Sequence, residues 1–173
     1  FNYKMEIISF DKLLLKTAFC CMASDGNIDK REITLVNSMC KKSLFFKDFN
    51  FKVEINLLVK DLNTRGKEFI CYYFDLLENS SLTEEEELIL IDFAIQTIKA
   101  DEKIEYSEIK FFKNIRQRLK VTNEIILENH NDLELFLEED IITDSYIDKL
   151  TKQYLEEIEL PLFNLIDIDI NSI

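Results

Sequence analysis

Two short stretches of the chain hold carboxylates at matching positions. The first is residues 24–33 (SDGNIDKREI), and the second, 76 residues later, is residues 100–109 (ADEKIEYSEI). Carboxylate oxygens are the ligands that Ca²⁺ and Mg²⁺ prefer, and Zn²⁺ also accepts them. The two stretches therefore supply six candidate ligands of a divalent cation (Ca²⁺, Mg²⁺ or Zn²⁺): Asp25, Asp29, Glu32, Asp101, Glu105 and Glu108.

An EF-hand calcium loop is the first known arrangement to compare with these stretches. Its second half fits, because loop positions 5, 6, 8 and 12 would fall on Asp25, Gly26, Ile28 and Glu32. Its first half does not fit: positions 1 and 3, which need oxygen ligands, would be Cys21 and Ala23. In the second stretch the same positions would be Thr97 and Lys99. The pattern argues against an EF-hand.

Helix capping explains most of the same residues without any ligand. With Asp29 as N-cap, Glu32 lies at N3 and completes a capping box, and Gly26 is suited to end the preceding helix in a left-handed conformation. Glu105 and Glu108 repeat the box in the second stretch. Capping leaves Asp25 and Asp101 unexplained, because a carboxylate at a helix C-terminus opposes the helix dipole. This recurring aspartate is the local feature that favours a binding function.

Glycine and histidine content excludes several classes of site. Gly26 and Gly66 are the only glycines, so neither a Rossmann fingerprint nor a P-loop is present, and we expect no nucleotide partner. His130 is the single histidine, which excludes a multi-histidine metal site. Acid–base catalysis would have to use carboxylates alone, so we predict that the protein is not an enzyme.

The net charge of −13 comes mostly from the C-terminal part. Residues 131–173 contain 12 acidic and two basic side chains, whereas residues 1–130 contain 22 and 19. Because phosphate affinity needs Lys and Arg, this balance argues against nucleic acid and against an anionic membrane as partners. A basic face on the first part, formed by Lys113, Arg116 and Lys120, could instead meet this acidic tail.

The tail itself has an amphipathic pattern rather than a disordered one. Its apolar stripe indicates a helix over about residues 143–159, ended by Pro161: Ile147, Leu150, Tyr154 and Ile158. Two interpretations are open. The helix packs on the rest of the chain, or the tail is an acidic docking arm whose apolar residues 160–170 bind a partner protein or a second copy.

The hydrophobic pattern is helical nearly throughout, so the predicted fold class is all-α. We expect helices over about residues 9–23, 30–42, 48–62, 66–77, 84–98 and 106–119, and a short one after Thr122. Strand-like alternation occurs at residues 165–170. We predict that the chain divides into a helical bundle over 1–130, built from two repeated helix–acidic turn–helix units, and an acidic extension over 131–173.

Four cysteines without Cys-x-x-Cys spacing, and no signal peptide pattern, indicate reduced thiols and a cytoplasmic location.

The paired motifs give the chain a family resemblance over about residues 10–128. Ala23-Ser24-Asp25-Gly26-Asn27-Ile28-Asp29-x-x-Glu32 and its copy, Lys99-Ala100-Asp101-x-x-Ile104-x-x-x-Glu108, resemble the TerB-like tellurite-resistance domains. They are also similar to the N-terminal helical domain of a DnaJ-type membrane co-chaperone. The copy departs from the pattern, with Glu102 in place of glycine and Glu105 in place of aspartate.

The resemblance implies a compact helical bundle, two neighbouring acidic turns, and a divalent-cation site made by their carboxylates. It also implies a role in tellurite or general stress responses without established catalysis. We therefore predict a non-enzymatic TerB-like binding domain with a divalent cation at the paired acidic turns. The alternative is a protein-interaction or scaffold module that uses the acidic extension, in which the turns are purely structural caps.

Overall fold

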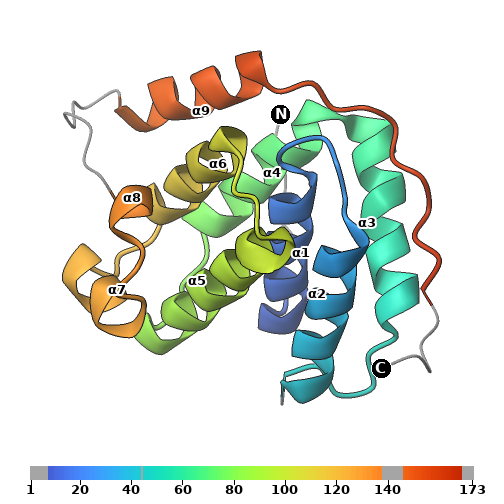
Figure 1. The fold of residues 1–173 in the computed structure, drawn as a ribbon, viewed down its shortest axis with the longest axis horizontal. Coiled ribbons are helices and arrows are strands. Elements are labelled where there is room, and N and C mark those ends of the chain that lie inside the picture. Colours follow the sequence, from blue (N-terminus) through green and yellow to red (C-terminus); the bar gives the residue numbers. More distant parts are fainter. Residues whose placement is uncertain (1–7, 44, 138–145, 169–173) are drawn as a thin grey trace.

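The computed structural model describes residues 8–43, 45–137 and 146–168, and their regular structure is helical. The elements are α1 (Phe10–Ala23), α2 (Lys30–Lys42), α3 (Phe51–Arg65), α4 (Lys67–Glu78), α5 (Glu84–Ile98), the 3-10 turn η1 (Lys99–Asp101), α6 (Tyr106–Gln117), α7 (Asn123–Asn129), α8 (Glu134–Leu137) and α9 (Tyr146–Glu157) (Figure 1). This confirms the all-α class. Residues 165–168, where alternation suggested a strand, carry no strand, and residues 169 and 170 lie outside the described part.

Helix α1 forms the centre of the fold. It contacts α2, α3, α4, α5 and α6, with its most extensive contact against α5 (Figure 1). Its residues 13–23 are buried without a break, which explains why this stretch of the sequence is apolar on every side. The one charged residue in it, Lys16, places its ammonium 4.8 Å from the ring centroids of Phe69 and Tyr72, in cation–π geometry.

Helix α9 packs against α6 through aromatic rings. The ring of Tyr154 lies 5.5 Å from that of Phe111 on α6, and the Phe111 ring lies 5.4 Å from Phe74 on α4. Two basic side chains outside the predicted basic face contact this helix as well: Lys110 forms an ion pair with Glu157, and an Nη of Arg118 donates to the Thr151 hydroxyl at 2.9 Å. Of the apolar stripe predicted for this helix, Leu150, Tyr154 and Ile158 are buried, and the Ile147 side chain lies outside the described part.

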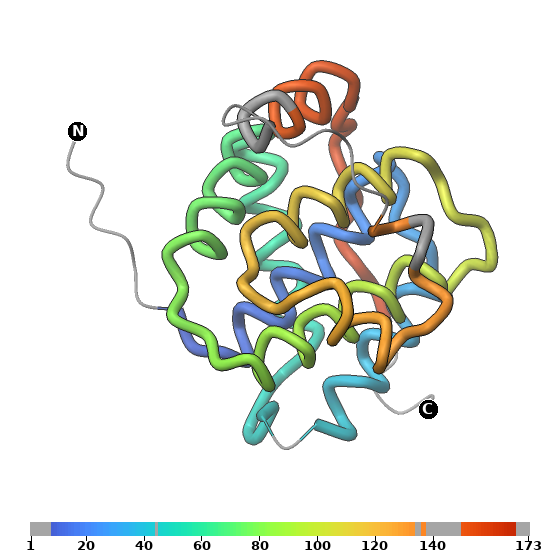
Figure 2. The backbone as a smooth tube through the Cα atoms, turned by 90° about the vertical axis from the view of Figure 1, so that its left-hand side faces the viewer, coloured from blue at the N-terminus to red at the C-terminus, as the bar shows by residue number. Residues whose placement is uncertain are grey.

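After α9 the chain runs as an extended strap, which we define as residues 158–168. The strap follows α3 along its length, as Figure 1 shows, and Figure 2 gives the same path from the side. Ile158 and Ile166 are buried in the common core, while Leu162 and Leu165 point to solvent and are 81% and 57% exposed. The described end of the extension is therefore held against the helices of residues 1–130.

Two further features of the described residues bear on the sequence predictions. None of their helices has the length and apolar content needed to span a membrane. Their four cysteines are free, and Cys20, Cys21 and Cys40 are buried. Burial raises the pKa of the Cys20 thiol to about 12, which leaves it in the unreactive protonated form.

Candidate functional site

The first acidic turn joins α1 to α2 and ends in the predicted capping box. The Asp29 side chain accepts from Arg31 N at 2.7 Å, and Glu32 Oε1 accepts from Asp29 N at 3.1 Å. Gly26 has φ +80°, the left-handed conformation expected where α1 ends. The predicted architecture of this turn is confirmed.

The second turn joins η1 to α6 and repeats the arrangement. Glu108 Oε2 accepts from Glu105 N at 2.7 Å, which completes the predicted capping box of α6. Glu102 has φ +63° and so adopts the left-handed conformation that glycine provides in the first copy. Lys103 Nζ lies 2.9 Å from Glu105 Oε1, so this cap carries an ion pair as well.

Asp25 and Asp101, which capping alone did not explain, each have a structural role in their turn. Asp25 Oδ1 accepts from Asn27 N at 2.9 Å, and Asp101 Oδ1 accepts from Lys103 N at 3.1 Å. In both copies the acceptor stands two residues before the donor, which is the Asx-turn arrangement. The matching aspartates therefore shape the turns, which gives them a structural role that helix capping does not provide.

The fold brings the two turns together, because η1 packs against α2. Burial raises the pKa of Glu32 to about 9, and the negative charges of Asp25, Glu108 and Asp101 add to the effect. The pKa of Glu108 is raised to about 7 by burial and by the negative charges of Asp25, Asp101 and Glu105. Burial and the charges of Asp101 and Glu105 also raise the pKa of Asp25. We call Asp25, Glu32, Asp101 and Glu108 the carboxylate cluster.

Asp29 and Glu105 have different surroundings from the cluster. Hydrogen bonds from the Arg31 side chain and backbone lower the pKa of Asp29, which stabilises its ionised form. Glu105 is paired with Lys103 at the rim of the second turn. The six predicted residues thus divide into four clustered carboxylates and two that already pair with a cationic side chain.

Glu32 is the least satisfied member of the cluster. Its side chain is 2% exposed and its Oε2 atom is buried without a hydrogen-bond partner, while Oε1 caps α2. A buried oxygen of this kind is costly unless a proton or a cation occupies it. Among the described residues, however, no three His, Cys, Asp or Glu side chains are arranged to hold a metal ion as they stand. A cation would therefore require the clustered side chains to rotate toward one another.

The C-terminal extension adds groups to this region that the sequence motif does not contain. A surface depression of about 630 Å³ beside Asp25 is also lined by Ser107 and by Glu157 and Glu159 of the extension. Gly26 lies directly beneath the strap, since a Cβ there would stand 3.1 Å from the Glu159 carbonyl oxygen. The acidic composition of residues 131–173 was the one sequence signal for this contact, and it did not indicate where the acidic residues lie.

His130, the single histidine of the sequence, belongs to neither acidic turn. It follows α7, and its Nε2 lies 3.7 Å from Asp92 Oδ1 on α5.

No protein-family model matches the chain, no curated protein matches its sequence, and no solved structure matches its fold. What the site can do therefore has to follow from its own side chains.

Proposed function

We propose that the protein is a non-enzymatic, cytoplasmic TerB-like binding domain that acts in a stress or tellurite/metal response. Its two repeated helix–acidic turn–helix units, α1–α2 and α5–α6, place their turns side by side and hold one divalent cation between them. The observation that carries this proposal is the buried, unpartnered Oε2 of Glu32 among three further carboxylates of the two turns.

The cluster residues would hold the cation through the oxygens that do not cap the turns. Asp25, Glu32, Asp101 and Glu108 each use one oxygen for a backbone N–H and keep the other. A bound divalent cation supplies the positive charge that offsets their mutual repulsion. Asp29 and Glu105 would join as ligands only by leaving Arg31 and Lys103.

The test is a titration with Ca²⁺, Mg²⁺ and Zn²⁺, each alone, followed by backbone amide shifts and by thermal unfolding. Because the cation competes with the protons of Glu32 and Glu108, we expect tighter binding at pH 8 than at pH 6, with shifts confined to both turns. Glu32→Gln should abolish the response. Glu86→Gln is the matched control, since Glu86 completes the capping box of α5 without belonging to the cluster. The absence of localised shifts at either turn would contradict the proposal.

A second candidate function is an interaction module in which the turns are caps alone. It is favoured by one observation: every predicted carboxylate in the two turns takes part in a capping box or an Asx turn. In this case the exposed acidic residues of the extension recruit a basic partner. Glu156→Lys with Glu159→Lys should then abolish salt-sensitive binding of a polylysine probe, whereas Glu32→Gln should leave it unchanged.

A further inference from the structure

The strap is held on α3 by two asparagine side chains, and both bind it in the same way. Asn63 Nδ2 donates to the Phe163 carbonyl and its Oδ1 accepts from Phe163 N, each at 2.9 Å. Asn56 Nδ2 donates to the Ile166 carbonyl at 2.9 Å, and its Oδ1 accepts from Ile166 N at 2.7 Å. Each amide thus pairs with both backbone groups of one strap residue. We call Asn56 and Asn63 the amide ladder.

The spacing of this ladder matches an extended peptide. Asn56 and Asn63 are seven residues apart on α3, so they lie on one face with an axial separation of about 10.5 Å. Phe163 and Ile166 are three residues apart, and three extended residues span about 10 Å. The distance between the two asparagine side chains on α3 therefore matches the distance between backbone groups three residues apart in an extended chain.

The contacts of the ladder do not depend on the strap's side chains. Amide-to-backbone hydrogen bonds are available to any residue except proline, so the specificity has to come from the flanking side-chain contacts. Ile166 is buried and Phe163 is half-buried, while Leu162 and Leu165 between and beside them face solvent. Lys52 Nζ lies 3.0 Å from Asp167 Oδ1, beyond the second ladder position. The α3 face is therefore complementary to an extended segment with an apolar residue, a second apolar residue three positions later, and a carboxylate at the next position.

From this geometry we infer that the α3 face is a binding site for an extended peptide of another protein that carries this apolar-x-x-apolar-acidic pattern. The strap is its intramolecular occupant and has to be displaced before the partner peptide binds. Lys52 selects the acidic end, and the amide ladder fixes the register and direction of the bound segment. Access to α3 is then controlled by the chain's own C-terminal segment.

The probe for this proposal is a labelled peptide with the sequence of residues 160–168 (LPLFNLIDI), added to the full chain. Phe163→Ala with Ile166→Ala in the chain weakens the strap but leaves α3 intact. We expect this variant to bind the peptide at least about tenfold more tightly than the wild type does, because the competing occupant is weakened. A peptide with aspartate at both apolar positions should not bind.

Asn63→Ala added to the strap variant should weaken binding about 10- to 30-fold, because it removes two backbone hydrogen bonds. Thr64→Ala is the matched control on the same helix, since the Thr64 hydroxyl bonds within α3 to Lys60 O and its side chain is exposed. Hydrogen exchange on the wild-type chain needs no variant. Excess peptide should speed exchange of the Phe163 and Ile166 amides while α3 stays protected.

Two results would overturn the inference. The first is a strap variant that keeps its helical circular dichroism and still binds no peptide, or binds it equally well with Asn63→Ala. The second is a wild-type chain that forms a concentration-dependent dimer by light scattering and loses it with Asn63→Ala, which would assign the face to the strap of a second copy.

Discussion

The hydroxyl of Tyr154 on α9 donates a hydrogen bond to the backbone carbonyl of Ser24 at 3.2 Å, across 130 positions of sequence. Ser24 is the C-cap of α1, so this contact ties the C-terminal extension to the first acidic turn. Tyr154 is 1% exposed, and its ring packs against Phe111. The shape of the first turn therefore depends on a residue outside the repeated motif.

Tyr154→Phe should lower the free energy of unfolding by about 1–2 kcal/mol, because it leaves the Ser24 carbonyl without its buried donor while the ring stays in place. Urea denaturation measures the change. Tyr106→Phe is the control and should change stability by less than about 0.5 kcal/mol, since Tyr106 is 69% exposed. Equal stability of Tyr154→Phe and the wild type would show that the hydroxyl contributes nothing to this contact.

The stability of the chain should fall as the pH rises from about 5 to 9. Glu32 and Glu108 have pKa values of about 9 and 7 in the folded chain, against an unfolded value near 4.5. Between these values the folded chain binds more protons than the unfolded chain, so raising the pH favours unfolding. Each such group contributes a slope of about 1.4 kcal/mol per pH unit at most. Denaturation curves recorded at several pH values measure this slope.

Glu32→Gln should flatten this pH dependence, since glutamine resembles the protonated carboxyl and does not ionise. Its stability should therefore exceed that of the wild type by more at pH 8 than at pH 6. Glu86→Gln, in the α5 capping box, should keep the wild-type slope. A wild-type stability that is flat or rises over this range would contradict the buried, like-charged surroundings of Glu32.

Local signals in the sequence predicted the turns well. Helix α2 spans the predicted residues Lys30–Lys42, and the boxes at Asp29–Glu32 and Glu105–Glu108 form as expected, because capping involves neighbours three residues apart. Helix α3 was predicted to start at Asp48 but begins at Phe51. Asn50 caps it by accepting from Val53 N, and Asp48 is left-handed with φ +55°.

Long-range contacts could not be predicted in the same way. The pairs Tyr154–Ser24 and Asn63–Phe163 are separated by 130 and 100 residues, and no periodicity in one segment specifies its partner in another. The amphipathic stripe on α9 indicated that the helix would bury one face. It did not indicate that α6 would cover that face, or that the strap would continue onto α3.

Both copies of the acidic turn should favour glycine at their equivalent positions 26 and 102, so removing it from the first and adding it to the second should change stability in opposite directions. Gly26→Ala should cost about 1–3 kcal/mol, because φ is +80° and the new Cβ would stand 3.1 Å from the Glu159 carbonyl oxygen. Glu102→Gly should gain up to about 1 kcal/mol, since φ at this position is +63°. Thermal unfolding of the wild type and of both variants measures these two changes in stability.

Glu87 on α5 should be the most sensitive carboxylate in the fold outside the two turns. It is 4% exposed, and its oxygens accept from Lys120 N at 3.0 Å and from Val121 N at 2.8 Å, which holds the turn between α6 and α7. Glu87→Gln keeps the shape but offers one acceptor oxygen, so it should lower the free energy of unfolding by about 1–3 kcal/mol. Urea denaturation followed by circular dichroism measures it.

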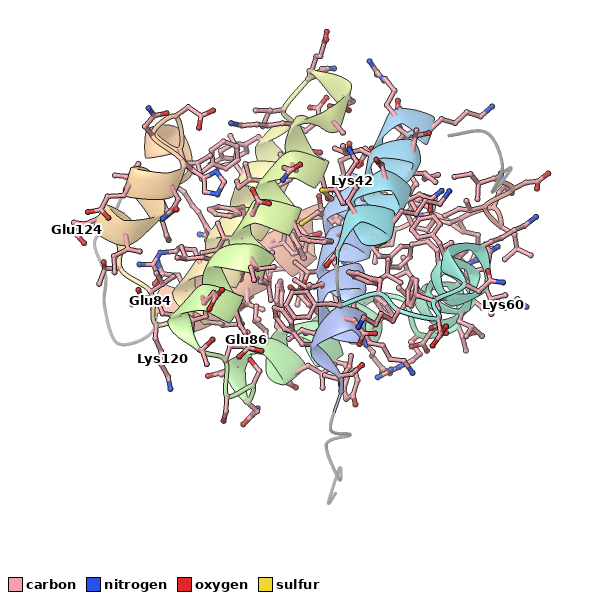
Figure 3. All side chains as sticks on the ribbon, turned by 90° about the horizontal axis from the view of Figure 1, so that it is seen from below. Lys42, Lys60, Glu84, Glu86, Lys120 and Glu124 are labelled. Atoms are coloured by element: carbon pink, nitrogen blue, oxygen red, sulfur yellow. The ribbon has the colours of Figure 1, made fainter. Side chains whose placement is uncertain are left out.

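Glu84→Gln is the matched control for Glu87→Gln. Glu84 lies one turn earlier on α5 and is exposed, and Figure 3 shows it with Glu86 and Lys120 at one end of the bundle. Its substitution should change stability by less than about 0.5 kcal/mol. If the two variants unfold alike, Glu87 does not hold the α6–α7 turn. If Glu87→Gln alone is destabilised, and exchange of the Lys120 and Val121 amides speeds up with it, the long-range cap is confirmed, because a general loss of helix would expose amides in every element.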